Sequence, residues 1–203
     1  MTEFHFGGGH RASHEPQACR GRPFQADFEE LHFRQSTQES ASAFGKLYRD
    51  SQGRRRRDVT ERTSDASHGH QFAVVEDPVA GECYVLDPTS KTVSTVPLNP
   101  DELKALGAMT SPLSCLREGT AGSPWQPTTW REERLETKFI EGVLCEGRLK
   151  TSEAGEIREL WSSHDLAETI LEKKSSPEGE ISYRLFNIRR EELDAALFLP
   201  PGI

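Results

Sequence analysis

The feature that most constrains this chain is a run of three short segments between residues 71 and 97, rich in β-branched and aromatic residues and separated by turn-forming sequences. The segments are residues 71–76, 82–86 and 91–96, and Pro97 closes the third. Residues 77–81 and 87–90 lie between them, and each begins with aspartate followed by proline, as turns often do. Because connections of about four residues favour hairpins, the sequence predicts a three-stranded antiparallel meander here.

Segments of the same kind flank this meander on both sides. We predict strands at residues 24–33, 43–48 and 54–60 before it, and at residues 131–140, 143–151, 156–162, 167–174 and 180–188 after it. Short turns are expected between them, at residues 50–53, 141–142, 152–155, 164–165 and 175–179. Residues 46–49 should therefore face residues 54–57 in a hairpin. In the last strand, alternation places Ile181, Tyr183 and Leu185 on one face, and Phe186 and Ile188 on the other.

This order of elements predicts a mainly β protein built on a curved antiparallel sheet, or incomplete barrel, with one or two short helices. Local turns between consecutive strands favour an antiparallel sheet over βαβ units. About ten strands exceed what a flat sheet carries comfortably, so the sheet is expected to curl. A short helix is expected from Asn99, because residues 99–102 combine a capping side chain, a proline at the first helical position and two acids.

The remaining segments are expected to be irregular or terminal. Residues 1–23 contain three consecutive glycines and few apolar residues, so we predict a disordered tail. Residues 24–203 then form a single antiparallel β half-barrel domain. Within this domain, residues 110–127 are expected to be a long loop, residues 189–196 a helical turn, and residues 197–202 an apolar tail that docks on the sheet.

Composition and charge exclude several classes of protein. Hydrophobic residues make up 34% of the chain, and no window approaches the ~18 apolar residues that a membrane span needs. The chain has 33 acidic and 25 basic residues, a net charge of -8. This balance argues against binding nucleic acid through bulk positive charge. The first residues hold no apolar run of the kind found in secretory signals, which indicates a cytoplasmic protein if Met1 is the true start.

Catalytic, metal-binding and cofactor-binding motifs are absent from the sequence. It has neither a nucleophile-elbow serine motif nor a glycine-rich phosphate loop. His68 and His70 lie two residues apart and could bind a transition metal with a neighbouring carboxylate, but two ligands do not make a site. We therefore expect no metal, no cofactor and no catalytic residues.

The cysteines and a run of arginines each leave two interpretations open. Four cysteines allow three disulfide pairings, or Cys83 and Cys145 are small buried residues in strands; the others are Cys19 and Cys115. Residues 54–57 are four consecutive arginines, of which alternation lets only two share a face. They form either a patch for phosphate or anionic lipid, or a solvated strand at a sheet edge, and the acidic balance of the chain favours the second.

The aromatic and aliphatic residues of the expected strands suggest a cavity. Such residues at strand period belong more often to a core than to a ligand pocket, but a curled sheet with one helix has few other elements to cover them. We take as candidate ligand-binding residues those expected to line the concave face of the sheet: Phe72, Val74, Tyr84, Leu86, Phe139, Trp161, Tyr183 and Leu185.

Several turn-bounded segments in order resemble a family of uncharacterised bacterial exported proteins. The segments are residues 47–57, 75–88, 140–147 and 183–188, followed by 196–200. That family is similar in pattern to the lipoprotein-carrier half-barrels of the LolA and LolB type and to related periplasmic sensors. The resemblance implies an incomplete antiparallel barrel whose concave face accepts acyl chains or a partner segment, and a location in the periplasm.

Three functions follow as hypotheses. The first is non-catalytic binding of an apolar ligand, a lipid or a lipoprotein acyl chain, in the concave face, which requires an apolar cavity. The second is an envelope protein-protein interaction or sensor module on the same fold, which requires a filled barrel and an uncharged edge strand. The third is an enzyme, which requires acids or histidines clustered in the cavity. The sequence does not identify the ligand, the partner or the oligomeric state.

Overall fold

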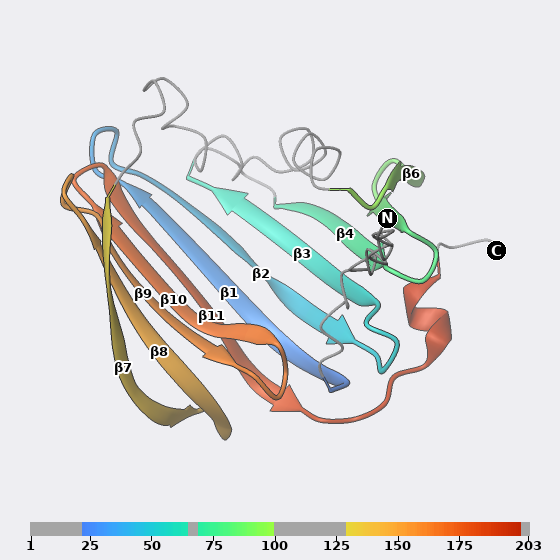
Figure 1. The fold of residues 1–203 in the computed structure, drawn as a ribbon. Helices are drawn as coiled ribbons and strands as arrows, with labels where there is room; N and C mark the ends of the chain where they lie inside the picture. Colours follow the sequence, from blue (N-terminus) through green and yellow to red (C-terminus); the bar gives the residue numbers. More distant parts are fainter. Residues whose placement is uncertain (1–21, 65–68, 100–128, 200–203) are drawn as a thin grey trace, which may run out of the picture.

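The computed structural model describes residues 22–64, 69–99 and 129–199 of the 203-residue chain, and within these residues the protein is a single curved antiparallel sheet (Figure 1). Eleven strands pair in the order β6-β5-β4-β3-β2-β1-β11-β10-β9-β8-β7. The two end strands, β6 and β7, do not pair with each other, so the sheet is open. The predicted fold class, an incomplete antiparallel barrel, is confirmed.

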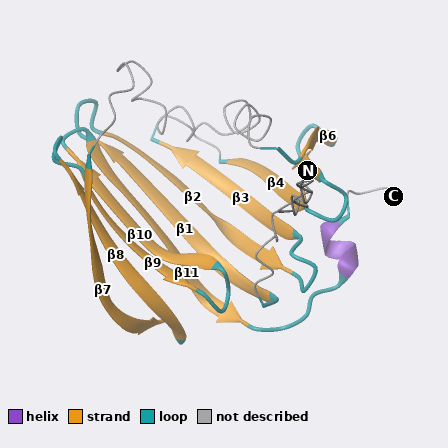
Figure 2. Cartoon of the chain, in the orientation of Figure 1, coloured by secondary structure: helices purple, strands orange, loops and turns teal. Residues whose placement is uncertain are grey.

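The strand bounds follow the alternating segments of the sequence closely. They are β1 Phe24–Arg34, β2 Glu39–Arg49, β3 Arg55–Thr63, β4 His70–Asp77, β5 Glu82–Asp87, β6 Thr92–Pro97, β7 Trp130–Ile140, β8 Val143–Ser152, β9 Ile157–Ser163, β10 Glu168–Ser176 and β11 Gly179–Arg189. Strand β10 runs through Ser176, so the turn predicted at residues 175–179 is shorter than expected. Among the described residues the helical content is one 3₁₀ turn, η1 Ala195–Phe198 (Figure 2).

The sheet consists of two meanders joined side by side. Strands β1–β6 form one meander and β7–β11 the other, each with every strand paired to its neighbours in sequence. The join is the antiparallel pair β1–β11, in which Phe28 faces Leu185 and Glu30 faces Tyr183. Two strands from opposite ends of the described chain therefore lie in the middle of the sheet, where Figure 1 shows them adjacent.

Three of the tight turns begin with an aspartate that accepts hydrogen bonds from the turn backbone. Asp50 accepts from the amides of Gln52 and Arg54 at 3.0 and 2.9 Å, and Asp77 from those of Val79 and Ala80 at 2.9 and 3.0 Å. Asp87 repeats the pattern between β5 and β6. These bonds are the physical reason that the aspartate-containing segments form the predicted turns. The predicted hairpin forms, but residues 46–49 pair with residues 55–58, one position beyond the expected 54–57.

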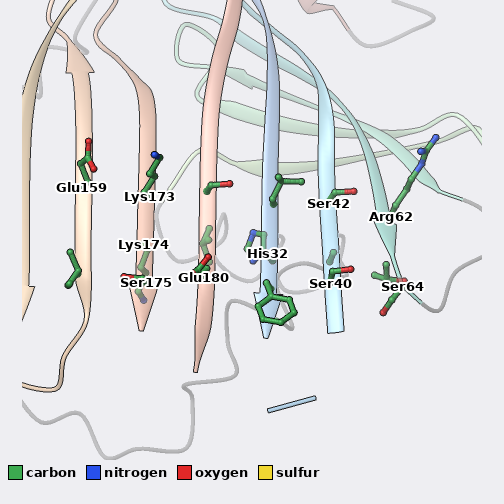
Figure 3. A pocket seen from close by; sticks show the side chains of 17 residues that line it. His32, Ser40, Ser42, Arg62, Ser64, Glu159, Lys173, Lys174, Ser175 and Glu180 are labelled. Atoms are coloured by element: carbon green, nitrogen blue, oxygen red, sulfur yellow. The ribbon is translucent and has the colours of Figure 1, made fainter. Parts of the chain in front are cut away.

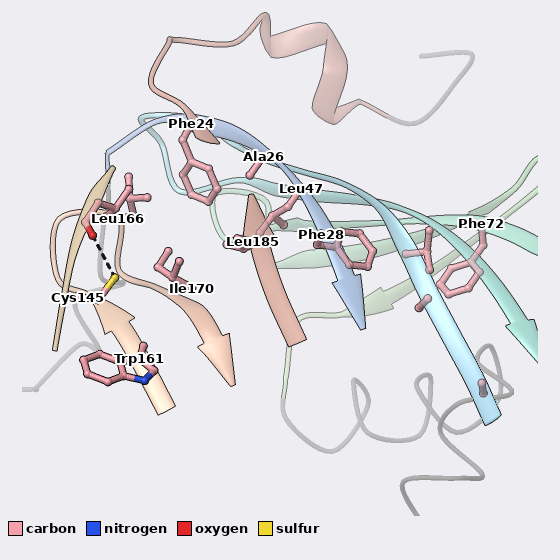
Figure 4. Close-up of a cluster of buried hydrophobic side chains, with 14 residues drawn as sticks. Phe24, Ala26, Phe28, Leu47, Phe72, Cys145, Trp161, Leu166, Ile170 and Leu185 are labelled. Atoms are coloured by element: carbon pink, nitrogen blue, oxygen red, sulfur yellow. Dashed lines mark hydrogen bonds between the residues drawn. The ribbon is translucent and has the colours of Figure 1, made fainter. Parts of the chain in front are cut away.

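The hydrophobic core is a cluster on one side of the curved sheet (Figure 4). It draws on both meanders: Phe24, Phe28 and Leu47 from the first, and Cys145, Trp161 and Leu185 from the second. Phe24, Phe28, Leu47, Cys145 and Leu185 are all 1% exposed or less. Burial across the join is what holds the two meanders in one sheet.

A bulge in β11 corrects one predicted side-chain orientation. Ile188 was expected on the face opposite Leu185, but it packs against the core cluster. The register between β1 and β11 shifts between Gln25 and Asp27, and Asn187 adopts a φ of 54°. The extra residue reverses the alternation after Phe186 and turns Ile188 toward the core.

The end of the described chain packs against the sheet, as was predicted for the apolar tail. Phe198 is completely buried, with the Arg54 guanidinium 5.3 Å from its ring centroid, and Arg56 donates a hydrogen bond to the carbonyl of Leu197 at 2.9 Å. The helical turn covers 195–198 rather than the predicted 189–196, because Asp194 caps it through the amide of Ala196. The predicted tail at 1–23, the helix from Asn99 and the loop at 110–127 lie wholly or mostly outside the described residues.

Candidate functional site

On the face of the central strands that carries the core cluster, the apolar residues are followed by buried charged and polar residues. Phe24, Ala26 and Phe28 alternate along β1 on this face, and the same phase then reaches Glu30 and His32, which are 3% and 5% exposed. We call this face the core face. The register of the neighbouring strands places Arg57 of β3 and Tyr183 of β11 on it as well. One half of the core face is therefore apolar and the other half polar.

Arg57 lies at the boundary between the two halves. Its guanidinium is 4.4 Å from the ring centroid of Phe28 and 5.9 Å from that of Tyr183, so the cation stacks over aromatic faces. It is 3.7 Å from one carboxylate oxygen of Glu30, and the other oxygen of Glu30 is 2.7 Å from Nε2 of His32. This places a cation, a carboxylate and an imidazole together on the core face.

Further ion pairs continue this cluster onto the second meander. Arg55 pairs with Glu168 at 2.9 Å across the join between the meanders. Arg158 pairs with Glu172 at 2.7 Å, and Lys174 with Glu156 at 2.9 Å. All of these groups except Glu156 border what we call the charged hollow, of about 440 Å³. Its lining residues are Glu30, Arg55, Arg57, Arg158, Glu168, Thr169, Glu172, Lys174, Ile181 and Tyr183.

Burial also perturbs the tyrosine of this hollow. Removal of Tyr183 from water raises its pKa to about 12, since the phenolate would lose hydration, and the nearby Arg57 opposes the shift only in part. Tyr183 is therefore a neutral phenol at physiological pH, able to donate a hydrogen bond.

The structure corrects the interpretation of the four arginines as an edge strand. Strand β3 lies inside the sheet between β2 and β4, so its arginines are not at an edge. As alternation required, Arg55 and Arg57 share one face, with ion pairs to Glu168 and Glu30, while Arg54 and Arg56 pair with Asp50 and Asp58. The run is a set of partly buried cations at the centre of the molecule.

A second and larger hollow lies where several strands begin or end. It measures about 880 Å³ and is bordered by β9, β10, β11, β1, β2 and β3, as Figure 3 shows. We call it the strand-end hollow; its lining residues are Leu31, His32, Phe33, Ser40, Ala41, Ser42, Arg62, Thr63, Ser64, Ile157, Glu159, Lys173, Lys174, Ser175, Glu180, Ile181 and Ser182. Leu31, Phe33 and Ile157 are 45%, 40% and 44% exposed, so apolar surface faces this space.

A third hollow, of about 930 Å³, lies beside the docked C-terminal segment. It is lined by residues of β2–β6 and of the β5–β6 turn, together with Ala196 and Leu199. Val93 and Leu199, which are 42% and 43% exposed, both border it. Five of the large exposed hydrophobic side chains thus line two hollows.

The structure brings five of the eight candidate ligand-binding residues together and leaves three apart. Phe72, Trp161 and Leu185 belong to the core cluster, and Val74 and Tyr183 pack against it. Tyr84 and Leu86 point to the other face, because Val85 between them faces Val74. Phe139 is 73% exposed and faces Leu144 on the β7–β8 hairpin. Phe72 and Leu86 line the third hollow and Tyr183 the charged hollow; contact with a ligand stays a prediction.

Sequence reasoning missed the charged part of the core face. The signal was present in β1, where Glu30 and His32 occupy the positions that continue the phase of Phe24, Ala26 and Phe28. Polar residues at core positions of an alternating strand indicate a buried polar cluster, since such groups need partners there.

Cys83 and Cys145 are both buried and both free thiols, which confirms their interpretation as small core residues. Burial and the nearby Glu76 raise the pKa of Cys83 to about 11, so this thiol is not activated as a nucleophile. Within the three described ranges no three His, Cys, Asp or Glu side chains are grouped to hold a metal ion. Across the same ranges, no helix has the length and apolarity that a membrane crossing requires.

Comparison with known proteins relates the fold to solved structures. No protein-family model matches the sequence, and no curated protein matches it. An uncharacterised conserved protein of Thermus thermophilus has a TM-score of 0.50 and 10% identity, over 91% of this chain and 89% of that one. Similarity at this identity shows a shared fold.

Two other solved structures are similar at lower scores. MucB of Pseudomonas aeruginosa, solved in complex with MucA, has a TM-score of 0.45 and 13% identity over 90% of this chain, which spans 56% of the matched chain. A LolA-superfamily protein of Nitrosomonas europaea has a TM-score of 0.35 and 7% identity, over 90% of this chain and 92% of that one.

Proposed function

We propose that this protein binds an apolar ligand, such as the acyl chain of a lipid or lipoprotein, in the strand-end hollow, without catalysing a reaction. The observation that carries the proposal is the position of Leu31, Phe33 and Ile157, three large side chains that are 40% exposed or more and all line this hollow. Exposed apolar side chains gathered in one concave site are typical of a ligand-binding surface, whereas scattered ones are not.

The size of the hollow and the energetics of burial support the same proposal. A volume of about 880 Å³ falls inside the range of about 300–1,000 Å³ that ligand pockets occupy. Each methylene removed from water contributes about 0.8 kcal/mol, so a chain of moderate length binds usefully without a polar anchor. Serines also line the hollow, and their hydroxyl groups can stay hydrated on the side that is open to water.

Titration with a fluorescent fatty acid tests this proposal. The wild type is expected to show saturable binding, and Phe33→Ser to weaken the dissociation constant about tenfold or more, since the loss of a contacting phenyl group removes about 1.5–3 kcal/mol. Phe139→Ser is the matched control: its ring is 73% exposed on the β7–β8 hairpin, outside this hollow, and binding should not change. Absence of saturable binding to the wild type would contradict the proposal.

A second candidate function, interaction with an extended segment of another protein, is favoured by the sequence of β6. This end strand, Thr92–Pro97, has no charged residue and pairs only with β5 in the described part of the chain. The opposite end strand, β7, carries several acidic and basic residues, which discourage pairing. An uncharged edge is the kind of surface on which a partner strand adds.

Site-specific photocrosslinking in cells distinguishes the two edges. A crosslinker at Thr95 on β6 is expected to capture one defined protein, whereas the same group at Glu133 on β7 should capture none. Equal capture from both edges, or from neither, would rule out strand addition at β6.

A further inference from the structure

Within the described residues, Arg57 is a cation held in place by aromatic rings and one long ion pair. Its position is set by the rings of Phe28 and Tyr183, and its ion pair with Glu30, at 3.7 Å, is too long for a hydrogen bond. Among the described residues its buried Nε has no hydrogen-bond acceptor. The guanidinium nevertheless lines the charged hollow, about one third exposed, so donors remain directed at a space that a ligand can enter.

The other cations of the charged hollow already have close carboxylate partners. Arg55 and Arg158 pair with Glu168 and Glu172 at 2.9 and 2.7 Å. Lys174 pairs with Glu156 at 2.9 Å. Glu30, the nearest acid to Arg57, directs its other oxygen to His32 at 2.7 Å. Arg57 is therefore the cation of this hollow with the weakest internal compensation.

Two neutral donors line the same hollow. The hydroxyl groups of Tyr183 and Thr169 make no side-chain hydrogen bond within the described residues. A planar guanidinium together with hydroxyl donors matches the oxygens of a carboxylate or phosphate group, which accept several hydrogen bonds at once. Glu30, Glu168 and Glu172 reduce the positive potential, so this geometry suits a single acidic group and not a polyanion.

We propose that the charged hollow is an anion-binding site in which Arg57, with the hydroxyls of Tyr183 and Thr169, receives one acidic group, a phosphate or carboxylate. This inference goes beyond the proposed binding of an apolar chain and does not depend on it. The acidic group has two possible sources, a free anion or the head of an amphiphile. Leu31 and Phe33 alternate with Glu30 and His32 along β1, so the strand-end hollow opens mainly on the face opposite the charged hollow, and the two linings share Lys174 and Ile181.

Calorimetric titration with three probes tests the proposal and separates the sources. The probes are inorganic phosphate, dodecyl phosphate below its micelle concentration, and dodecanol, which carries the same chain without the acid. The wild type is expected to bind dodecyl phosphate about tenfold more tightly than dodecanol, the size of one charge-assisted hydrogen bond. Saturable binding of inorganic phosphate alone, with no gain from the chain, would assign the site to a free anion.

Variants on opposite faces of the sheet locate the effect. Arg57→Gln should abolish the preference for the acid and leave dodecanol binding unchanged, and Tyr183→Phe, which removes only a hydroxyl, should reduce the preference in part. Arg184→Gln is the matched control, because Arg184 also stacks on a ring, Phe186 at 4.9 Å, and pairs with Glu29 at 2.8 Å, but lies on the opposite face. An acid preference that survives both Arg57→Gln and Tyr183→Phe, or the lack of any preference, overturns the anion site. Loss of dodecanol binding alone counts only against the apolar-chain proposal.

Discussion

Gly147 is a position where the absence of a side chain allows an aromatic residue to pack on the backbone. It faces Leu135 on β7 and Trp161 on β9 in the register of the sheet. A Cβ at this position would come within 2.6 Å of the Trp161 ring and 2.8 Å of Leu135 Cβ. The indole therefore occupies the space that a side chain at position 147 would need, and its Nε1 donates to Glu159 at 2.6 Å.

Substitution of this glycine tests the packing of the indole. Gly147→Ala should lower the free energy of unfolding by about 1–3 kcal/mol, because the added methyl group forces Trp161 out of its place. Urea denaturation followed by tryptophan fluorescence measures the change. Leu144→Ala on the same strand is the control: this side chain is 52% exposed, and a change equal to that of Gly147→Ala would contradict the explanation.

The raised pKa of Tyr183 predicts a specific loss of stability in alkali. Its folded pKa is about 12 against an ordinary value of 10.0, chiefly because it is buried. The folded state holds the proton more tightly, so this contribution to stability is complete below pH 10.0 and is lost as the pH rises through about 12. Between pH 9 and 11, the wild type should lose more unfolding free energy than Tyr183→Phe. Equal losses in urea titrations would show that Tyr183 ionises freely.

At the scale of single elements, hairpins depend on aspartates whose burial differs. Asp50 is 1% exposed and accepts hydrogen bonds from two backbone amides and from Nε of Arg54 at 2.6 Å. Asp87 also accepts from two backbone amides, those of Thr89 and Ser90, but forms no ion pair within the described residues, and the hydrogen bonds from Ser90 and Thr89 lower its pKa. The same turn signal in the sequence thus produces one buried and one exposed turn.

This difference in burial predicts which of two aspartate substitutions lowers the free energy of unfolding more. Asp50→Asn should lower the free energy of unfolding by about 1.5–3 kcal/mol, because it replaces charge-assisted hydrogen bonds in a buried place. Asp87→Asn should cost clearly less, since water replaces the lost interactions. Thermal and urea unfolding of both variants measure the order, and a larger loss for Asp87→Asn would show that burial does not set the effect.

At the scale of the whole molecule, the pairing of β1 with β11 places the best-protected strands at the centre of the sheet. Backbone groups of β1, β2 and β11 bond to a strand on each side, whereas β6 and β7 each bond to one within the described chain. The side chains of β6 and β7 are also mostly exposed. Stability against local opening should therefore fall from the centre toward both ends.

Native-state hydrogen exchange measures this gradient. Amides of β1, β2 and β11 should exchange most slowly, and those of β6 and β7 fastest, as local opening at an end strand breaks one ladder instead of two. As denaturant is added, the amide exchange rates of the central strands should be the last to increase. Slow exchange throughout β6 would instead indicate that this edge is covered.

Much of the fold was readable from the sequence because its signals are local. Alternation over a few residues and the turns that begin with Asp50, Asp77 and Asp87 predicted each described strand to within a few residues. The orientation of Ile188 was wrong because a bulge at Asn187 depends on how β11 fits β1, which alternation within one strand does not contain. The candidate cavity residues were chosen as apolar side chains, so Arg55, Arg57, Glu30 and His32 were left out.

The sequence by itself determined where the chain extends, where it turns, and that antiparallel strands follow one another. Only the tertiary structure decided that β1 pairs with β11, that β3 lies inside the sheet, and that the arginines and acids of the core face meet. The physical reason is the distance along the sequence between the residues that interact. Turns and alternation depend on a few consecutive residues, whereas the β1–β11 pair forms only when burial of side chains such as Phe28 and Leu185 outweighs the entropy of closing most of the chain into a loop.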